Sequence, residues 1–362
     1  MMRLTFPFVD GTRAATLAAL LNTSPLTRQG SGITSLFREA VAQQAASFSN
    51  LAYEVVESSS NAKGDQGAPL TALIIHGLFG SGRNWRTPAR KLAERADALA
   101  HGTDARSWQM VLVDLRNHGK SNELSDLTPP HDIQSAGQDL VRLFEAGTLP
   151  WPQTVIGHSL GGKVALEYAK VTAQAENEGA PKQVWVLDSV PGAVPSDDAK
   201  GDVERVLDEL HSLPEVIPSR KWLVERMKDR GFSPGLSEWM GSNLKRLPGR
   251  GDESELVFNP AGAQEMYDSY RDATYIPFLR DLPEGMNVDI VQAAKSDRWT
   301  PEILSELEAI VKESKGKRKG DGKLRMHVLP NAGHWVHMDN PKGLVDLLAP
   351  SLRELAQIGP GG

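Results

Sequence analysis

A serine framed by glycines is the strongest chemical signal in the chain. The segment Gly157-His158-Ser159-Leu160-Gly161 has a G-x-S-x-G pattern, in which the serine projects from a sharp, strained turn between a strand and a helix. Small residues beside such a serine let the backbone turn without clashes. An apolar run precedes the pattern and a helix-forming run follows it, as that geometry requires. We therefore predict that Ser159 is a nucleophile that attacks acyl carbonyl groups; the alternative is a glycine-rich turn with an idle serine.

The negative charge that builds on an attacked carbonyl oxygen has to be met by backbone N–H groups already aimed at it. Leu160 follows the nucleophile at the start of a predicted helix, so its N–H is expected to be one donor. The second donor is expected to be Leu78, in the segment His76-Gly77-Leu78-Phe79-Gly80 that follows an apolar run. Gly80-Ser81-Gly82 also opens like a dinucleotide-binding G-x-G-x-x-G fingerprint, but Trp85 stands at the third glycine position, and that interpretation fails.

A serine hydroxyl becomes a good nucleophile when a histidine accepts its proton. His334 lies in the segment 331–335, just beyond the last predicted strand, from which it can reach over the sheet. His327 lies within that strand and is predicted to be a packed residue. The spacing of His334 and His337 would suit two metal ligands, but no carboxylate or third histidine completes a site. We therefore predict neither a metal nor an organic cofactor.

Two aspartates end predicted strands downstream of Ser159. Asp188 closes the apolar run at 184–187, and Asp297 follows the run at 288–294. Either carboxylate is placed to orient the histidine and to stabilise the imidazolium that forms during the reaction. Position in the chain slightly favours Asp297, because the acid most often follows the penultimate strand. The aspartate that is not the acid is expected to cap the N-terminus of the next helix.

Short apolar runs alternate with helical patterns along most of the chain. Such alternation predicts an α/β fold with a mostly parallel, doubly wound sheet and right-handed crossovers. Ligands bind such sheets at the carboxyl ends of the strands, which is where the residues discussed above fall. The predicted strands cover residues 71–75, 110–114, 154–157, 184–188, 288–294 and 324–329, with a weaker one at 52–56.

The alternation stops between about residues 190 and 283. Helical patterns fill this stretch, and it is punctuated by Pro191, Pro195, Pro214 and Pro218. We predict a core formed by residues 51–190 and 284–356, with a helical cap insertion at 191–283 that lies over the strand ends. Residues 1–50 would form an N-terminal extension.

The composition is that of an ordinary globular protein, with 40% hydrophobic and 24% charged residues among 362. A formal charge of −6 argues against a nucleic-acid partner, and no apolar run is long enough to form a transmembrane segment, so we expect a soluble protein. Without cysteine, the chain has no disulfide, thiolate ligand or cysteine nucleophile. The extension is rich in Arg, Ser and Thr and poor in acids, which suits either a mitochondrial or plastid transit peptide or an ordinary extension of a cytoplasmic protein.

Four segments of the chain carry a family pattern: residues 76–81 (HGLFGS), 114–121 (DLRNHGKS), 157–163 (GHSLGGK) and 331–337 (NAGHWVH). Together they resemble the α/β-hydrolase superfamily, and within it the branch of the mitochondrial α/β-hydrolase domain-containing protein 11 and related small bacterial esterases. The resemblance implies the α/β-hydrolase fold and a Ser-Asp-His triad. It implies that Asp188 is the acid rather than Asp297, because Asp188 matches the branch's aspartate after the strand that follows the nucleophile helix, whereas the acid position of the wider superfamily falls on Ser296 here. It also implies that residues 114–121 build a structural turn that transfers no proton.

We therefore expect a lipase-like serine hydrolase that cleaves a carboxylic ester or thioester through an acyl-enzyme on Ser159. Asp188 would orient His334 as the base, and the N–H groups of Leu78 and Leu160 would bind the oxyanion. The expected partner is a small-molecule acyl ester or thioester. Two other functions fit the same frame: a ligand receptor or scaffold with little turnover, and a carbon–carbon bond hydrolase or lyase.

Overall fold

The computed structural model describes residues 51–58, 68–100, 106–124, 127–175, 179–194, 201–316 and 320–357. The predicted N-terminal extension at 1–50 lies outside these residues, so the ideas about a transit peptide stay predictions. No helix within the described ranges combines the length and the apolar character needed to cross a bilayer.

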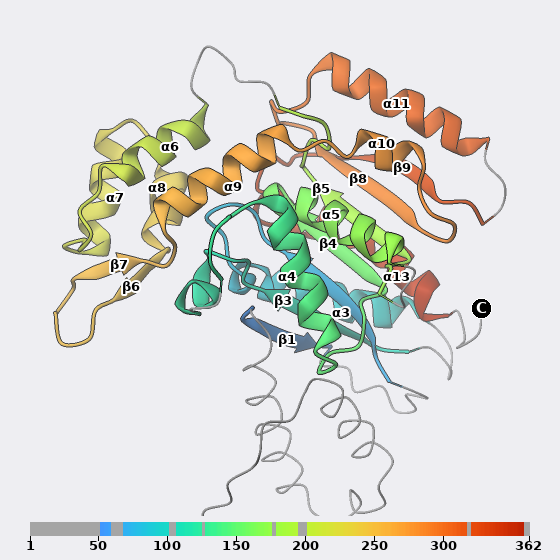
Figure 1. Ribbon diagram of the computed structural model, residues 1–362, viewed down its shortest axis with the longest axis horizontal. Helices are drawn as coiled ribbons and strands as arrows, with labels where there is room; N and C mark the ends of the chain where they lie inside the picture. Colours follow the sequence, from blue (N-terminus) through green and yellow to red (C-terminus); the bar gives the residue numbers. More distant parts are fainter. Residues whose placement is uncertain are drawn as a thin grey trace, which may run out of the picture.

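A seven-stranded sheet forms the centre of the fold (Figure 1). In spatial order its strands are β1 (Tyr53–Glu57), β3 (Trp108–Val113), β2 (Leu70–Ile75), β4 (Thr154–His158), β5 (Gln183–Leu187), β8 (Asn287–Ala293) and β9 (Lys323–Leu329). Only β1 is antiparallel to its neighbour; every other adjacent pair in this sheet is parallel. Strands β2 to β5 are buried along their whole length because helices cover both faces, which explains why their residues are mostly apolar rather than alternating. The predicted, mostly parallel α/β sheet is confirmed.

Helices pack on both faces of the sheet and enclose two apolar cores (Figure 1). On one face lie α3 (Arg86–Leu99) and α13 (Pro341–Ala356), and on the other lie α4 (Ile133–Glu145), α5 (Leu160–Gln174) and α11 (Pro301–Lys315). In α3 the buried residues Ala89, Leu92, Ala93 and Ala96 recur at helical spacing, which gives one apolar stripe toward the sheet. Short helical turns complete the loops: η2 (Gly82–Trp85), η3 (Gly119–Glu123) and α12 (Val336–Asp339).

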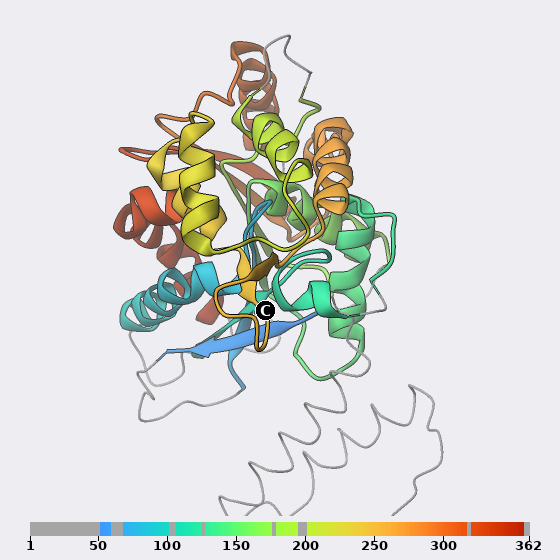
Figure 2. The ribbon, with the colours of Figure 1, turned by 90° about the vertical axis from the view of Figure 1, so that its left-hand side faces the viewer.

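The segment between β5 and β8 adds a further group of elements, most of which face the viewer in Figure 2. They are α6 (Asp202–His211), α7 (Arg220–Asp229), α8 (Pro234–Gly241), β6 (Leu244–Arg246), β7 (Ser254–Leu256), α9 (Pro260–Asp272) and α10 (Ile276–Arg280). The sequence indicated helices alone here, and the β6–β7 hairpin is new. Strands of three residues are too short to show a twofold hydrophobic period, so no sequence pattern marks them. We refer to residues 191–283 as the insertion; its standing as a cap domain remains a prediction.

A buried lysine ties both ends of the insertion to the core. Lys163 lies on α5 and is fully buried, and its Nζ donates to the carbonyl oxygens of Gly192 at 2.8 Å and Ala273 at 2.7 Å, as well as to that of Tyr270. Gly192 begins the insertion, and Tyr270 and Ala273 lie at the end of α9. Burial lowers the pKa of Lys163 to about 7, and the charge of Asp272 opposes that shift. One side chain therefore anchors two chain segments about 80 residues apart.

We expect Lys163→Met to lower the free energy of unfolding by about 3 kcal/mol, because three buried carbonyl groups lose their shared donor. Urea unfolding of both proteins measures the difference. Lys342→Met is the control: that side chain is 89% exposed and pairs only with Asp346, so a loss of about 0.5 kcal/mol or less is expected. Equal losses in the two variants would contradict the anchoring role of Lys163.

Candidate active site

The carboxyl ends of β2 and β4 meet where the strand order of the sheet reverses. From β2 the chain crosses to β3 on one side, and from β3 it returns to β4 on the other side of β2. Loops that leave two such strands diverge, which leaves room for a ligand between them. Residues 76–80 follow β2 and Ser159 follows β4, so two of the predicted site segments are neighbours here.

Ser159 has a backbone conformation that residues with a side chain rarely adopt, with φ 53° and ψ −123°. The turn needs glycine on both sides of the serine. A Cβ on Gly157 would lie 2.0 Å from the Gly161 carbonyl oxygen, and a Cβ on Gly161 would lie 2.4 Å from the His76 carbonyl oxygen. Helix α5 begins at the next residue, so the strained turn presents the serine between strand and helix. The two glycines of the G-x-S-x-G pattern are thus required by the close packing of backbone around Ser159.

Three side chains named from the sequence form one hydrogen-bonded row. Asp188 Oδ2 lies 2.8 Å from His334 Nδ1, and His334 Nε2 lies 3.0 Å from Ser159 Oγ. Asp188 directly follows β5, and His334 lies in the loop after β9, so both reach the switch point from strand ends. Because an ionised carboxylate only accepts, His334 Nδ1 carries a proton, and Nε2 is left to accept from the serine hydroxyl. This arrangement can remove a proton from Ser159.

Asp188 is fully buried and held by two further donors. Trp299 Nε1–H donates to Asp188 Oδ1 at 2.7 Å, and the Ala293 N–H donates to the same oxygen at 3.0 Å. Burial alone raises the pKa of this carboxyl, but the hydrogen bonds from His334, Trp299 and Ala293 outweigh burial and hold the pKa below its usual value. Asp188 is therefore ionised at neutral pH.

Asp297, the other candidate acid, is exposed on the loop after β8. Its charge raises the pKa of His334 from a distance, but within the described part of the chain no hydrogen bond joins the two side chains. The structure thus brings Asp188, and not Asp297, into contact with the imidazole.

The pKa of His334 is lowered below 6.5. Burial is the main cause and the charge of Arg298 adds to it, while Asp188 acts in the opposite direction. At neutral pH His334 is therefore uncharged, which is the form that can accept a proton.

The loop after β2 holds the Leu78 N–H in a fixed direction. The Gly77 carbonyl oxygen accepts from the Gly80 N–H at 3.0 Å and from His76 Nδ1–H at 2.8 Å. Because the peptide bond is planar and trans, the Leu78 N–H points away from these two bonds. Leu78 and Ser159 line the same cavity. The Leu160 N–H belongs to the first turn of α5, where a helix has no internal acceptor for it.

Phe79, next to Leu78, is fixed from both sides. Its φ is 58°, its N–H donates to His118 Nε2 at 3.1 Å, and its carbonyl oxygen accepts from Asn243 Nδ2–H at 2.9 Å. His118 Nδ1–H donates to the Arg116 carbonyl oxygen at 3.0 Å, which leaves Nε2 as the acceptor. His118 comes from the core and Asn243 from the insertion, and both are buried. The insertion therefore helps to hold the loop that carries one predicted oxyanion donor.

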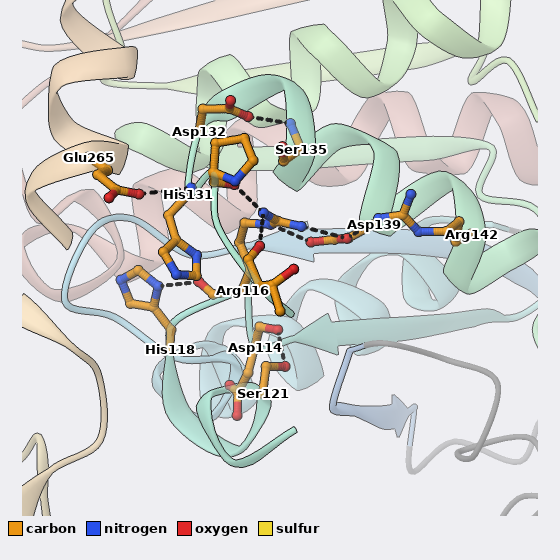
Figure 3. Close-up of polar contacts among 12 residues, drawn as sticks. Asp114, Arg116, His118, Ser121, His131, Asp132, Ser135, Asp139, Arg142 and Glu265 are labelled. Atoms are coloured by element: carbon orange, nitrogen blue, oxygen red, sulfur yellow. Dashed lines mark hydrogen bonds and ion pairs between the residues drawn. The ribbon is translucent and has the colours of Figure 1, made fainter. Parts of the chain in front are cut away.

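Residues 114–121 form a hydrogen-bonded turn beside this loop (Figure 3). Asp114 Oδ1 accepts from the Gly82 N–H at 2.7 Å. Arg116 makes two hydrogen bonds, of 2.7 and 3.1 Å, to the fully buried carboxylate of Asp139 on α4. Asp114 is bonded to backbone and Arg116 to the Asp139 carboxylate, which fits the structural role that the resemblance implied for this segment.

Two residues of the site carry no signal in the sequence. Trp299 contacts Asp188, which is 111 residues away in the chain, and Asn243 contacts Phe79, which is 164 residues away. Their types suggest no chemistry by themselves. A third, His158, sits at a variable position of the serine pattern, yet its Nε2–H donates to the His334 carbonyl oxygen at 2.7 Å.

A cavity of about 290 Å³ opens beside Ser159. Core loops form part of its wall, and the insertion supplies Asp202, Val203, Val206, Ser233, Leu236 and Trp239. Within the described residues no three His, Asp or Glu side chains are grouped so as to hold a metal ion. The expectation that the site works without a metal or cofactor stays a prediction.

Comparison with known proteins gives concordant results. Residues 72–347 match the family described as "Alpha/beta hydrolase family". The chain is 24% identical over 294 residues to the mouse sn-1-specific diacylglycerol lipase ABHD11, which covers 80% of this chain and 83% of the mouse protein. It is 34% identical over 283 residues to the esterase YbfF of Escherichia coli K12, which covers 75% of this chain and 89% of that protein.

Among solved structures, a marine microorganism esterase superposes with a TM-score of 0.60 at 21% identity, covering 82% of this chain and 97% of that one. At this identity the likeness bears on the fold alone. The α/β-hydrolase fold expected from the resemblance is confirmed.

Replacing each candidate acid separates their roles. We expect Asp188→Asn to lower kcat for ester hydrolysis about 10³- to 10⁴-fold, because the amide no longer stabilises the imidazolium. Asp297→Asn removes the same charge from an exposed position and should change kcat less than about threefold. Steady-state kinetics on one ester measures both variants. A large loss in Asp297→Asn with normal turnover in Asp188→Asn would transfer the role to Asp297.

Asn243 offers a test of how the loop after β2 is held. We expect Asn243→Leu to lower kcat about tenfold or more with little change in KM, because the Phe79 carbonyl loses its donor and the neighbouring Leu78 N–H is no longer held in place. Lys245→Gln is the matched control, since its exposed ion pair with Glu123 also joins the insertion to the core but does not touch this loop. Normal kcat in Asn243→Leu would show that the loop holds its shape without this bond.

Proposed function

We propose that this chain, which belongs to the alpha/beta hydrolase family, cleaves carboxylic ester or thioester bonds through an acyl-enzyme on Ser159. The observation that carries the proposal is the unbroken row Asp188–His334–Ser159, with contacts of 2.8 and 3.0 Å. The carboxylate is ionised, the imidazole is neutral and the serine hydroxyl has its acceptor, so each group is already in the state that the first step requires.

In the first half-reaction, His334 Nε2 accepts the Ser159 proton as the serine oxygen attacks the acyl carbon. Asp188 stabilises the resulting imidazolium through the bond to Nδ1 that already exists. The oxyanion accepts hydrogen bonds from the N–H groups of Leu78 and Leu160. One such donor typically stabilises the transition state by about 3–4 kcal/mol. When the intermediate collapses, His334 gives its proton to the departing alcohol or thiol.

In the second half-reaction, water takes the place of the leaving group. His334 accepts one proton from the water while the water oxygen attacks the acyl carbon of the acyl-enzyme. The same two N–H groups then donate hydrogen bonds to the second oxyanion. Collapse of this intermediate releases the carboxylic acid and returns the proton from His334 to Ser159 Oγ. The residues named thus complete a full cycle by themselves.

The relatives support an esterase- or lipase-like hydrolase that acts on a small molecule. The mouse relative is named a diacylglycerol lipase and the bacterial one an esterase. Neither name assigns a leaving group or a chain length to this protein. A small-molecule acyl ester or thioester is the substrate class that the cavity and the serine best support.

The two alternative functions make different predictions. A receptor or scaffold would bind its ligand and leave it intact, and a carbon–carbon bond hydrolase or lyase would leave simple esters intact. The contact between His334 Nε2 and the Ser159 hydroxyl supports ester cleavage, because it provides the proton acceptor that attack on an acyl carbon needs.

A series of p-nitrophenyl esters from acetate to palmitate tests the proposal. We expect the wild type to hydrolyse at least one member and Ser159→Ala to lose at least about 10³-fold in kcat, because no acyl-enzyme can form. Ser233→Ala is the control: Ser233 lines the same cavity but only caps α8, so its loss should leave kcat within a few-fold. Near-normal turnover in Ser159→Ala would refute the mechanism.

A further inference from the structure

The cavity beside Ser159 has three charged side chains in its wall, apart from its histidines: Asp202, Asp339 and Arg298. Two of them have partners. Asp202 Oδ1 lies 3.2 Å from Arg205 Nη1, and Asp339 Oδ2 accepts the Gly333 N–H at 2.8 Å. Arg298 makes neither an ion pair nor a hydrogen bond with any residue that the structure describes. Among the residues that the structure describes, Arg298 is therefore the charged side chain of this wall with neither an ion pair nor a hydrogen bond.

The chain next to Arg298 is fixed relative to the reacting groups. Trp299 is buried, and its Nε1–H donates to Asp188 Oδ1 at 2.7 Å, so the residue after Arg298 is bonded to the same carboxylate that holds His334. Arg298 itself is half-buried in the loop that follows β8. The residue next to Arg298 is thus bonded to the Asp188–His334–Ser159 row, and the Arg298 side chain lines the same cavity as Ser159 and His334.

When no anion is bound, the positive charge of Arg298 disfavours protonation of His334. Its positive charge lowers the pKa of His334, second only to burial, while Asp188 and Asp297 raise it. The reaction requires His334 to become positively charged, and a neighbouring cation disfavours that state. An anion bound to Arg298 would cancel this repulsion at the moment when the imidazolium forms.

We propose that Arg298 binds an anionic group of the substrate, a carboxylate or a phosphate, while Ser159 attacks the acyl carbonyl of the same molecule. This proposal rests on the proposed function, because it names the substrate class of the same site. A guanidinium presents paired N–H donors that match the oxygens of both anions. The substrate is then a negatively charged ester or thioester, and its charge both contributes to binding and restores the basicity of His334.

The experiment compares neutral and anionic esters of matched shape. For a charge on the acyl side, the pair is the mono-p-nitrophenyl ester of glutaric acid and the same ester with its free carboxylate replaced by a primary amide. For a charge on the leaving group, the set is the butyrate esters of 4-hydroxybenzamide, 4-hydroxybenzoate and 4-hydroxyphenyl phosphate. The measured quantity is the ratio of kcat/KM for the anionic ester to that for the neutral one, in wild type and in Arg298→Gln.

In wild type we expect the ratio to exceed one in at least one of the two sets, and in Arg298→Gln we expect it to fall about tenfold or more. The set in which it falls identifies the side of the substrate that carries the charge. Arg95→Gln is the control: it removes the same charge from the surface of α3, where Arg95 pairs with Asp346 outside the cavity, and should leave both ratios unchanged.

A pH profile on a neutral ester gives a second readout. Removal of the Arg298 charge should raise the pKa of His334, so the acid limb of kcat/KM is expected at higher pH in Arg298→Gln than in wild type. Two other imidazoles face His334, but the pKa values of His158 and His337 are themselves lowered by burial and by the charge of His334, that of His337 to about 4. Both imidazoles are present in wild type and in Arg298→Gln alike, so the shift between the two proteins is read as the loss of the Arg298 charge.

The outcomes separate this proposal from the proposed function. Hydrolysis of the neutral esters with the same ratios in wild type and Arg298→Gln would overturn the role of Arg298 and leave the serine mechanism intact. A shifted acid limb without a change of ratio would do the same, because it would show that Arg298 is near His334 but does not contact the substrate. Failure of the wild type to hydrolyse any ester, neutral or anionic, would overturn the proposed function and this proposal with it.

Discussion

The contact between the Gly161 backbone and the His76 carbonyl oxygen holds the site together. No side chain fits between them, since a Cβ on Gly161 would lie 2.4 Å from that oxygen. The strained turn at Ser159 therefore lies directly against the loop that follows β2. Because of this contact, the serine and both predicted oxyanion donors come from backbone that is packed together at the switch point of the sheet.

Among the residues that the structure describes, only one of the histidines around the switch point contacts a carboxylate. Burial lowers the pKa of His76 to about 4, and burial together with the charge of His76 lowers that of His118 to about 3. Each stays neutral and uses one nitrogen to donate and the other to accept, so that the loops after β2 and β3 are joined by His76 Nε2 to the Leu115 N–H and by His118 Nε2 to the Phe79 N–H. His334 differs because a buried carboxylate contacts it and stabilises its charged form. The same residue type thus joins two loops in one place and, in the proposed mechanism, accepts a proton in another.

The insertion is coupled to the reacting groups at three levels. Lys163 anchors both of its ends to α5, Asn243 bonds the loop after β2, and residues of α6 and α8 form a wall of the cavity. Changes in the insertion are therefore expected to alter both the shape of the pocket and the alignment of the oxyanion loop. Arg298, which has no ion-pair partner among the described residues, comes instead from the core, because it follows β8 and precedes Trp299, which is bonded to Asp188.

The sequence by itself determined the seven strands of the main sheet, the strained serine turn and the histidine that reaches it, because each depends on neighbours a few residues away: an apolar run, a glycine within two positions, or a loop that starts where a strand ends. Chain position slightly favoured Asp297 whereas the family resemblance favoured Asp188, and nothing in the sequence marked Trp299, Asn243 or the β6–β7 hairpin. Only the tertiary structure decided which carboxylate meets His334, since both follow strands and only the packing of β5 beside β8 turns Asp188 inward and leaves Asp297 exposed. The physical reason is distance along the chain. A strained turn is specified locally, whereas a hydrogen bond between residues more than 100 positions apart exists only once the sheet has brought their strand ends together.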